Sequence, residues 1–260
     1  MASTVKPTIW CPGIVPVGHP LRTGLGGLWP LWAGSGPKAM DVSGNGKNGT
    51  LTNMPLATCW VPSAEGMSLD VITNDYVDTG IRAAGQQQTL AVWLIPDAIA
   101  AGIHGATGAP RLYIGAYDGS TMYLGCGDKN SGLAGPNTLV VGKLSMLAVT
   151  FDGSTARGYT DGIEFGTLTS VTWTGVGAAN LTFGSLSGTY PFDGKLLGGA
   201  YWHRCLGQPE LAYLTAHPDA LITRDDSLEA WATATAGGAP PAGLSIPIAM
   251  RHYMRMMGAA

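Results

Sequence analysis

The chain has 260 residues, a formal net charge of -3 and a charged fraction of 12%, about half the usual quarter of residues. This weak charge balance excludes a nucleic-acid binder that works through a broad basic surface, and equally an acidic disordered tail. The 39 glycines and 17 prolines suit short strands and tight turns rather than a helical bundle. Composition therefore predicts an all-β protein, with a length that suits one large domain or two small ones.

The N-terminal segment is the first feature along the chain. Residues 1–12 contain a single lysine and no apolar stretch typical of a secretory signal, so we expect synthesis in a cytoplasm. Residues 1–26 hold four prolines ahead of the first core strand, and we expect them to form an extended arm that lies on a neighbouring molecule. The alternative is that both ends of the chain, this arm and the C-terminal tail, fold back over their own sandwich and cover an edge strand.

Short apolar or alternating segments broken by turn residues follow the arm. They predict strands at residues 89–95, 111–117, 121–124, 145–151 and 195–202. Asp-Gly pairs tolerate the positive φ angles of a type I′ turn, which predicts hairpin tips at residues 118–119, 152–153, 161–162 and 193–194. The pattern indicates antiparallel sheets packed as a sandwich or jelly roll. The side chains that we expect in its core are Trp29, Leu31, Trp93, Leu147, Val149, Phe151, Leu196, Tyr201 and Leu214.

Helical signals appear only toward the C-terminus. Residues 208–215 combine a proline in the first turn, an adjacent acid and leucines three residues apart, which predicts a helix that ends before His217. A second short helix is expected to begin at Asp225 or Asp226, whose carboxylates can cap it. The sandwich with its helices is therefore expected to occupy residues 27–232.

The chain changes character twice beyond residue 232. Residues 233–243 are small residues with a Pro-Pro pair, which is typical of a linker. Residues 244–260 are apolar and basic, too short for an isolated helix and too apolar to remain in water, so we expect this tail to dock on a partner. The expected docking residues lie on or beside one helical face: Met250, Arg251, Tyr253, Met254, Arg255 and Met257.

The cysteines give no sign of a zinc site or a disulfide framework. They lie far apart with no C-x-x-C pair, at Cys11, Cys59, Cys126 and Cys205. We expect buried or unreactive thiols, with pairing left open if the protein reaches an oxidising medium.

Six motifs occur in an informative order. The chain reads Gly-Leu-Trp-Pro-Leu-Trp at residues 27–32, Asp-Val-Ser-Gly-Asn-Gly-Lys-Asn-Gly-Thr-Leu at 41–51 and Thr-Leu-Ala-Val-Trp at 89–93. It continues with Leu-Ala-Val-Thr-Phe-Asp-Gly-Ser at 147–154, Tyr-Thr-Asp-Gly at 159–162 and Phe-Asp-Gly-Lys-Leu at 192–196. Together with the helix, these motifs resemble the concanavalin A-like, laminin-G-like sandwich family over about residues 27–222. The resemblance implies an antiparallel jelly roll.

A narrower resemblance concerns tailed phages. The Leu-Trp-Pro-Leu-Trp opening, Ala-His-Pro-Asp-Ala-Leu-Ile at residues 216–222, the Pro-rich linker and the basic tail are similar to proteins of phage structural-gene regions. This resemblance implies a non-enzymatic virion structural protein, made in the host cytoplasm, that decorates or cements the capsid as a homo-oligomer and contacts other virion proteins. The alternative is a carbohydrate-binding adhesin that contacts host glycans through some of its aromatic residues.

The sequence shows no catalytic motif and no membrane span. Glycoside hydrolysis needs two carboxyl groups about 5 to 9 Å apart, and the family's retaining enzymes carry them as E-x-D-x-x-E, which surrounds none of the four glutamates. Glu65 and Glu164 are better explained as solvated surface. No G-x-S-x-G elbow occurs, and charge-free stretches such as residues 170–192 are too rich in Gly, Ser, Thr and Asn to cross a bilayer.

Calcium is the one cofactor that the family resemblance implies. Related sandwiches bind it with carboxylate and carbonyl oxygens at loop tips, and Asp41 with Asn45 matches that position here. A hard cation needs six or more oxygens, and the chain does not reveal the others. The simpler interpretation is an Asx turn in which Asp41 accepts backbone N–H groups.

Overall fold

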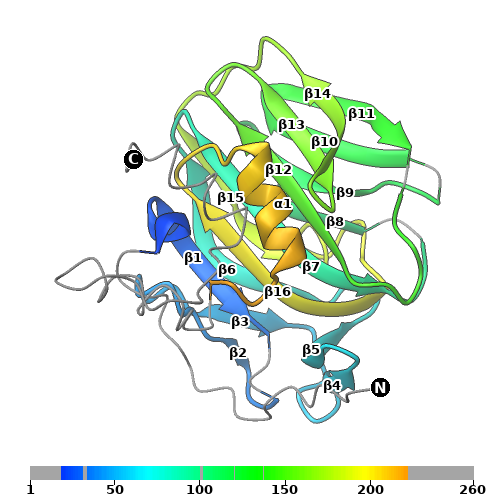
Figure 1. Cartoon of the computed structure of the whole chain (residues 1–260). Coiled ribbons are helices and arrows are strands. Elements are labelled where there is room, and N and C mark those ends of the chain that lie inside the picture. The colour runs from blue at the N-terminus through cyan, green and yellow to red at the C-terminus, as the bar shows by residue number, and fades with distance from the viewer. Residues whose placement is uncertain (1–18, 32–33, 100–101, 120, 137, 222–260) are drawn as a thin grey trace, which may run out of the picture.

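The computed structural model describes residues 19–31, 34–99, 102–119, 121–136 and 138–221. In this part of the chain two antiparallel sheets pack face to face (Figure 1), which confirms the predicted all-β jelly roll. Sheet A has the order β14-β13-β12-β7-β16-β5-β4, and β1 also pairs with β16. Sheet B has the order β11-β10-β9-β8-β15-β6-β3-β2.

The strands of sheet A are β1 (Leu25–Pro30), β4 (Trp60–Ser63), β5 (Gly66–Val71), β7 (Gln88–Pro96), β12 (Ser145–Phe151), β13 (Ala156–Thr160), β14 (Ile163–Leu168) and β16 (Gly194–Trp202). Those of sheet B are β2 (Lys38–Ala39), β3 (Gly49–Thr52), β6 (Tyr76–Ala84), β8 (Gly102–Ala106), β9 (Arg111–Ala116), β10 (Thr121–Gly127), β11 (Lys129–Pro136) and β15 (Val176–Phe183). All five segments predicted as strands are strands.

Three of the four Asp-Gly pairs lie between paired strands, as predicted. They connect β9 to β10, β12 to β13, and β13 to β14. The prediction for Asp193 and Gly194 is wrong, because Asp193 ends a loop that connects the two sheets and Gly194 begins β16. A Cβ on Gly194 would lie 2.4 Å from the carbonyl oxygen of Ile95, so glycine is needed here for close approach to β7 and not for a hairpin.

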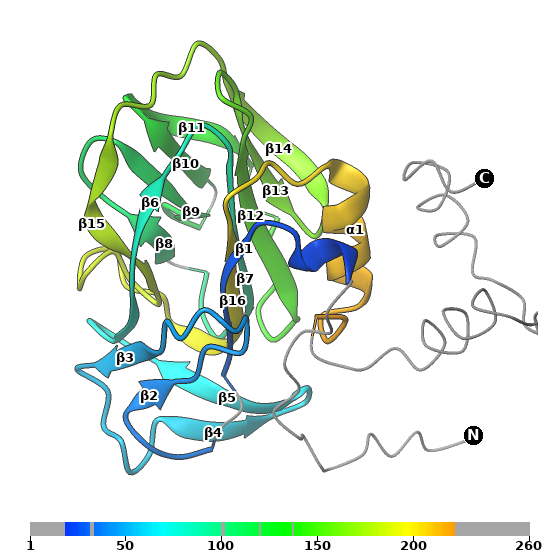
Figure 2. The same cartoon turned by 90° about the vertical axis from the view of Figure 1, so that its left-hand side faces the viewer.

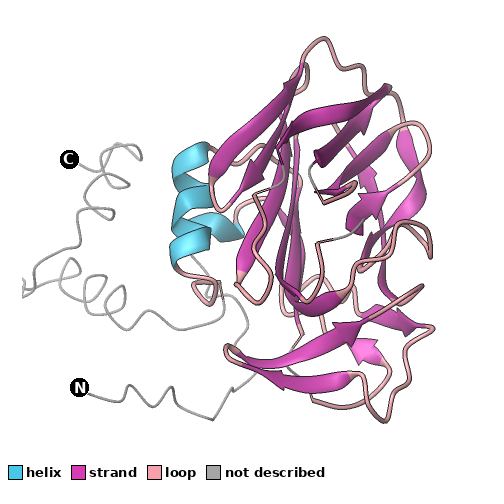
Figure 3. Cartoon of the chain, turned by 90° about the vertical axis from the view of Figure 1, so that its right-hand side faces the viewer, coloured by secondary structure: helices cyan, strands magenta, loops and turns pink. Residues whose placement is uncertain are grey.

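The predicted helix forms α1 (Gln208–Ala216) and packs on the outer face of sheet A (Figures 2 and 3). Glu210 accepts a hydrogen bond from the backbone N–H of Gly207 at 2.8 Å and forms a 2.8 Å ion pair with Arg204. Leu211 and Leu214 are buried in a cluster with Trp93 and Trp202 of the sheet. The second helix expected at Asp225 or Asp226 lies outside the described residues.

The N-terminal boundary differs from the predicted one, because residues 19–26 belong to the body and not to an arm on a neighbour. A short helix, η1 (Pro20–Arg22), precedes β1 and buries Leu21 in the cluster beneath α1. The indole Nε1 of Trp202 donates a 2.7 Å hydrogen bond to the carbonyl of Leu21. Arg204 Nε likewise donates to the carbonyl of Thr23 at 2.7 Å. Residues 1–18 lie outside the described part of the chain.

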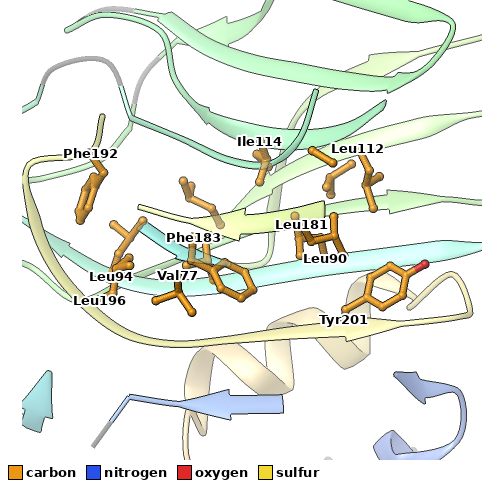
Figure 4. Packing of buried hydrophobic residues seen from close by; sticks show 14 of the residues in the cluster. Val77, Leu90, Leu94, Leu112, Ile114, Leu181, Phe183, Phe192, Leu196 and Tyr201 are labelled. Atoms are coloured by element: carbon orange, nitrogen blue, oxygen red, sulfur yellow. The ribbon is translucent and has the colours of Figure 1, made fainter. Parts of the chain in front are cut away.

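All nine side chains predicted for the core are buried. Most lie between the two sheets, where Figure 4 shows Phe183, Leu90, Leu112 and Tyr201 among the packed residues. Trp93 and Leu214 belong instead to the cluster under α1. The body therefore has three layers, with sheet A between sheet B and the helix.

Two large rings occupy space that glycines leave in the core. Trp29 on β1 pairs with Gly199 on β16, and a Cβ on Gly199 would lie 2.2 Å from the ring of Phe183. Trp29 also covers Gly27, where a Cβ would lie 2.3 Å from its ring, and the Trp29 and Phe183 centroids are 5.6 Å apart. Phe183 comes from sheet B, so this contact joins the two sheets.

We expect Gly199→Ala to destabilise the protein by about 1 to 3 kcal/mol, because the added methyl group overlaps the Phe183 ring. Gly119→Ala is the matched control, since its nearest contact is an ordinary 3.4 Å. Urea denaturation measures both. Equal losses in the two variants would show that the ring can move aside.

Candidate functional site

Four tyrosines gather on the outer face of sheet B, which we call the tyrosine face: Tyr113, Tyr117, Tyr123 and Tyr190. Side chains alternate along a strand, and on β9 Leu112 and Ile114 enter the core. Tyr113 therefore points to the opposite face, where it packs with Tyr123 of β10. In Figures 2 and 3, α1 lies on the far side of the sandwich from this sheet.

The register of β9 and β10 seats each tyrosine beside a glycine. Tyr113 pairs with Gly125, and Tyr123 pairs with Gly115. A Cβ on Gly125 would lie 2.2 Å from the Tyr113 ring, so the ring lies directly against the backbone of the neighbouring strand. The absence of a side chain at Gly125 leaves room for the Tyr113 ring, whereas the absence of one at Gly115 allows the close approach of β8.

The rings form a continuous stack. Tyr113 and Tyr123 have centroids 5.9 Å apart with planes 10° apart, and Tyr117 and Tyr123 have centroids 4.8 Å apart with planes 18° apart. Tyr190 completes the group, 6.0 Å from Tyr117. Tyr113 is 4% exposed, and burial raises its pKa to about 12, whereas Tyr117 and Tyr190 are 42% and 39% exposed. The stack thus has a buried base and an accessible end.

Tyr190 is held by the loop of residues 184–193, which we call the β15–β16 loop. The φ angle of Tyr190 is 53°. This left-handed conformation is rare for a bulky residue and persists only when the surrounding structure enforces it. The carbonyl of Tyr190 accepts a 3.1 Å hydrogen bond from the N–H of Ile103. Within the loop, Leu186 and Thr189 exchange two backbone hydrogen bonds. The ring is therefore preorganised before any ligand arrives.

The strands beneath the tyrosine face carry no acidic side chain. No aspartate or glutamate occurs in β8, β9, β10 or β15. Asp78 on the neighbouring β6 accepts hydrogen bonds from Asn180 Nδ2 at 3.0 and 3.2 Å and from the N–H of Gly80 at 2.8 Å. These strands present aromatic and polar groups together with one cation, Arg111, which is hydrogen-bonded to Tyr113. Such a surface suits binding, and the four strands lack the carboxyl pair of a glycosidase.

The structure brings the predicted calcium residues Asp41 and Asn45 into one turn. The Asp41 carboxylate accepts backbone N–H groups from Leu28 at 3.1 Å and from Ser43 and Lys47 at 2.8 Å each. Asn45 donates through Nδ2 to the carbonyls of Leu25 and Gly26. These bonds match the Asx-turn interpretation, and calcium binding stays a prediction. Among the described residues no group of three or more His, Cys, Asp or Glu could hold a metal.

The other singled-out residues are dispersed. Glu164 forms a 3.9 Å ion pair with Arg157 and accepts a hydrogen bond from Thr167, and Glu65 lies in a turn between β4 and β5. Three cysteines are free thiols whose pKa values are raised by burial: Cys59, Cys126 and Cys205. The following lie outside the described residues: Cys11, Met250, Arg251, Tyr253, Met254, Arg255 and Met257.

The tyrosine face was not predicted from the sequence, although the sequence contains a signal for it. Consecutive strands contain Tyr113-Ile-Gly115 and Tyr123-Leu-Gly125, separated by an Asp-Gly turn. In an antiparallel hairpin this repeated Tyr-x-Gly pattern can place each tyrosine opposite a glycine. Tyr190 had no such signal, because its position depends on the conformation of the loop.

No helix in the described part of the chain has the length and hydrophobicity needed to cross a bilayer.

The chain belongs to the concanavalin A-like lectin/glucanases superfamily, whose laminin-G-type family matches residues 72–212. No curated protein sequence matches this chain. Among solved structures it is similar to domain 4 of a GH43 extracellular arabinanase from Geobacillus stearothermophilus, solved in complex with arabinotriose. That match has 15% identity, a TM-score of 0.57, and coverage of 74% of this chain and 98% of the other.

Two further structures share the fold at low identity. A Trypanosoma rangeli sialidase in complex with the inhibitor DANA matches at 17% identity and a TM-score of 0.58, over 80% of this chain but 34% of the sialidase. The binding domain of Paraclostridial Mosquitocidal Protein 1 matches at 15% identity and a TM-score of 0.55, over 75% of this chain and 52% of the other. At these identities the similarities show the sandwich fold alone.

We expect Asp41 to act as a structural brace. Asp41→Ala should lower the free energy of unfolding by about 2 to 3 kcal/mol, because three backbone N–H groups lose a charged acceptor. Asp41→Asn, which keeps one acceptor oxygen, should lose less. Adding EDTA should leave the melting temperature of the wild type unchanged. A fall of several degrees on chelation would instead establish a stabilising bound cation.

Proposed function

We propose that this member of the superfamily is a non-enzymatic carbohydrate-binding protein whose ligand lies on the tyrosine face. The observation that carries the proposal is the pair of exposed rings, Tyr117 and Tyr190, fixed in contact with each other on one outer sheet face. Large rigid rings contribute binding energy at a low entropic cost. A glycan bound there is the interpretation that accounts best for both the exposure and the rigidity of these rings.

The chemistry of the face suits a sugar ring. The face of an aromatic ring carries partial negative charge, and it attracts the weakly positive C–H groups on one side of a pyranose or furanose. Asp78 on β6 and Asn180 on β15 are partly exposed farther along the same sheet, and these hydrogen-bonded groups can also contact sugar hydroxyls. The whole chain is only 12% charged, so a neutral saccharide fits this surface better than a strongly ionic ligand.

The comparisons support a binding role through the fold. The arabinanase domain was solved with arabinotriose, and the mosquitocidal-protein domain is described as a binding domain. Both are too distant in sequence to transfer a ligand to this chain. They support the proposal because sandwiches of this type do serve as binding modules within larger proteins.

The absence of a carboxyl pair under the tyrosine face supports a non-enzymatic role. β8, β9, β10 and β15 have no acid, and Asp78 is already engaged by Asn180 and Gly80. A hydrolase would need an acid and a second carboxylate on opposite sides of the scissile bond. We therefore propose that a bound glycan leaves this face unchanged.

We expect Tyr117→Ala and Tyr190→Ala each to weaken glycan binding about tenfold, which corresponds to about 1.4 kcal/mol for a lost ring contact. Tyr213→Ala on α1 is the control, because that residue lies on the opposite side of the sandwich. Binding of the pure full-length chain to a printed glycan array measures all three. Equal binding by all variants would move the ligand to another surface, and no binding by the wild type would contradict the function.

A second proposal concerns how the sandwich is attached to a larger particle, and it follows from where the chain enters and leaves the described body. Leu21 near the start of the described body and Leu221 at its end share the cluster on the outer face of sheet A. The tyrosine face belongs to the other sheet. We propose that residues 1–18 and 222–260 attach the body to a phage virion, as the phage resemblance implies, and that the tyrosine face points outward.

Deletion of residues 244–260 tests this attachment. The melting temperature should be nearly unchanged, because residues 19–221 contain the two paired sheets and the buried core between them, while co-sedimentation with assembled capsids should be lost. A variant with Arg251 and Arg255 replaced by Ala keeps the length of the tail and should weaken co-sedimentation in part. Unfolding of the body on deletion would show that the tail belongs to its core.

A further inference from the structure

His104 lies in the interior of the sandwich beside the β15–β16 loop. It is fully buried on β8, and its Nδ1 accepts a 3.0 Å hydrogen bond from the N–H of Gly184, the first residue of that loop. Its Nε2 is buried and has no hydrogen-bond partner. Because Nδ1 accepts a hydrogen bond, the proton of the neutral imidazole is on Nε2.

The imidazole contacts both ends of the loop. Phe192 near the end of the loop packs edge-on against it, with ring centroids 5.4 Å apart. The N–H of Phe192 also donates a 2.6 Å hydrogen bond to the carbonyl of Gly184, so the two ends are joined to each other and to His104. The adjacent Ile103 binds the carbonyl of Tyr190. Two neighbouring residues of β8 thus fix the base of the loop and the residue that it presents.

We propose that His104 is a positioning residue, which keeps Tyr190 in the tyrosine face by closing the base of the β15–β16 loop, and that protonation of its imidazole releases the loop and weakens carbohydrate binding. The inference rests on the proposed function of the tyrosine face. A protonated Nδ1 becomes a donor and faces the Gly184 N–H, which is also a donor. The hydrogen bond that closes the loop is then lost.

The direction of the pH effect follows from burial. Burial lowers the pKa of His104 to about 3, whereas an imidazole that is exposed to water once the loop has opened has a pKa near 6.5. The neutral side chain therefore favours the closed loop fully above about pH 6.5, and this contribution is lost progressively as the pH falls toward 3. The lowered pKa is due to burial and not to a charged neighbour.

Several titratable groups lie on the elements around the imidazole: Asp75 before β6, Arg111 and Tyr113 on β9, Tyr190 and Asp193 in the loop, and Lys195 on β16. Of these, Asp75 has a pKa raised by burial and by Asp70. Its carbonyl would lie 2.8 Å from a Cβ on Gly184. A variant that retains Asp75 and removes only the titrating imidazole is therefore needed to assign the effect.

His104→Asn and His104→Leu form the matched pair of variants. The Asn Oδ1 can take the place of Nδ1 as an acceptor without titrating, whereas Leu offers no acceptor. Hydrogen-exchange protection factors of residues 184–193, measured on the full chain at pH 7 and pH 5, report closure of the loop without any ligand. Binding of the same proteins to the printed glycan array at both pH values reports the effect on the site.

At pH 7 we expect the loop of His104→Leu to lose about tenfold in protection and its glycan binding to weaken about tenfold, while His104→Asn stays close to the wild type. At pH 5 the wild type should lose protection and binding, and His104→Asn should keep both. Unchanged loop protection in His104→Leu, or an equal acid response in His104→Asn, would overturn the proposal. If the wild type bound no glycan, the proposed function would fail, and the loop protection alone would still decide the role of His104.

Discussion

The fit of Trp29 and Phe183 into the space left by Gly27 and Gly199 is the contact on which the rest of the structure depends. It joins β1 to β16 and both to the facing sheet. Phe183 ends β15, and the next residue, Gly184, opens the loop that carries Tyr190. The placement of one ring in the core therefore determines where the accessible end of the tyrosine stack lies. Any residue larger than glycine at position 199 would disturb this chain of contacts.

The packing of an aromatic ring over a strand glycine occurs both in the core and on the outer face of sheet B. In the core, a ring covers a strand glycine and is enclosed by the opposite sheet. On the outer face of sheet B, Tyr113 covers Gly125 in the same manner, but the stack that it starts continues outward to the exposed Tyr117 and Tyr190. The high glycine content thus serves aromatic packing within strands as well as tight turns. Composition alone indicates only the role of glycine in turns.

The sequence predicted the strands and the buried side chains well, because alternation and β-branched runs report directly on which face of a strand meets a core. It predicted α1 because proline and glutamate in the first turn are local signals. The prediction of a hairpin tip at Asp193 and Gly194 failed, because an Asp-Gly pair can also occur at the start of a strand. The tyrosine face needed the register between β9 and β10 and the path of a loop, which single-strand patterns do not contain. Asp41 was placed correctly in its turn, since an Asx turn is also a local structure.

The positions of Leu21 and Leu221 in one cluster have a topological consequence. The chain enters and leaves this body on the same face. Such a body can be inserted into a surface loop of an unrelated host domain, and the strand order of the body and of the host domain both stay intact. The Trp202 and Arg204 hydrogen bonds to Leu21 and Thr23 would hold the entering segment of such an insert against the end of β16. The module is thus suited to transfer between proteins as an internal cassette, and not only as a terminal fusion.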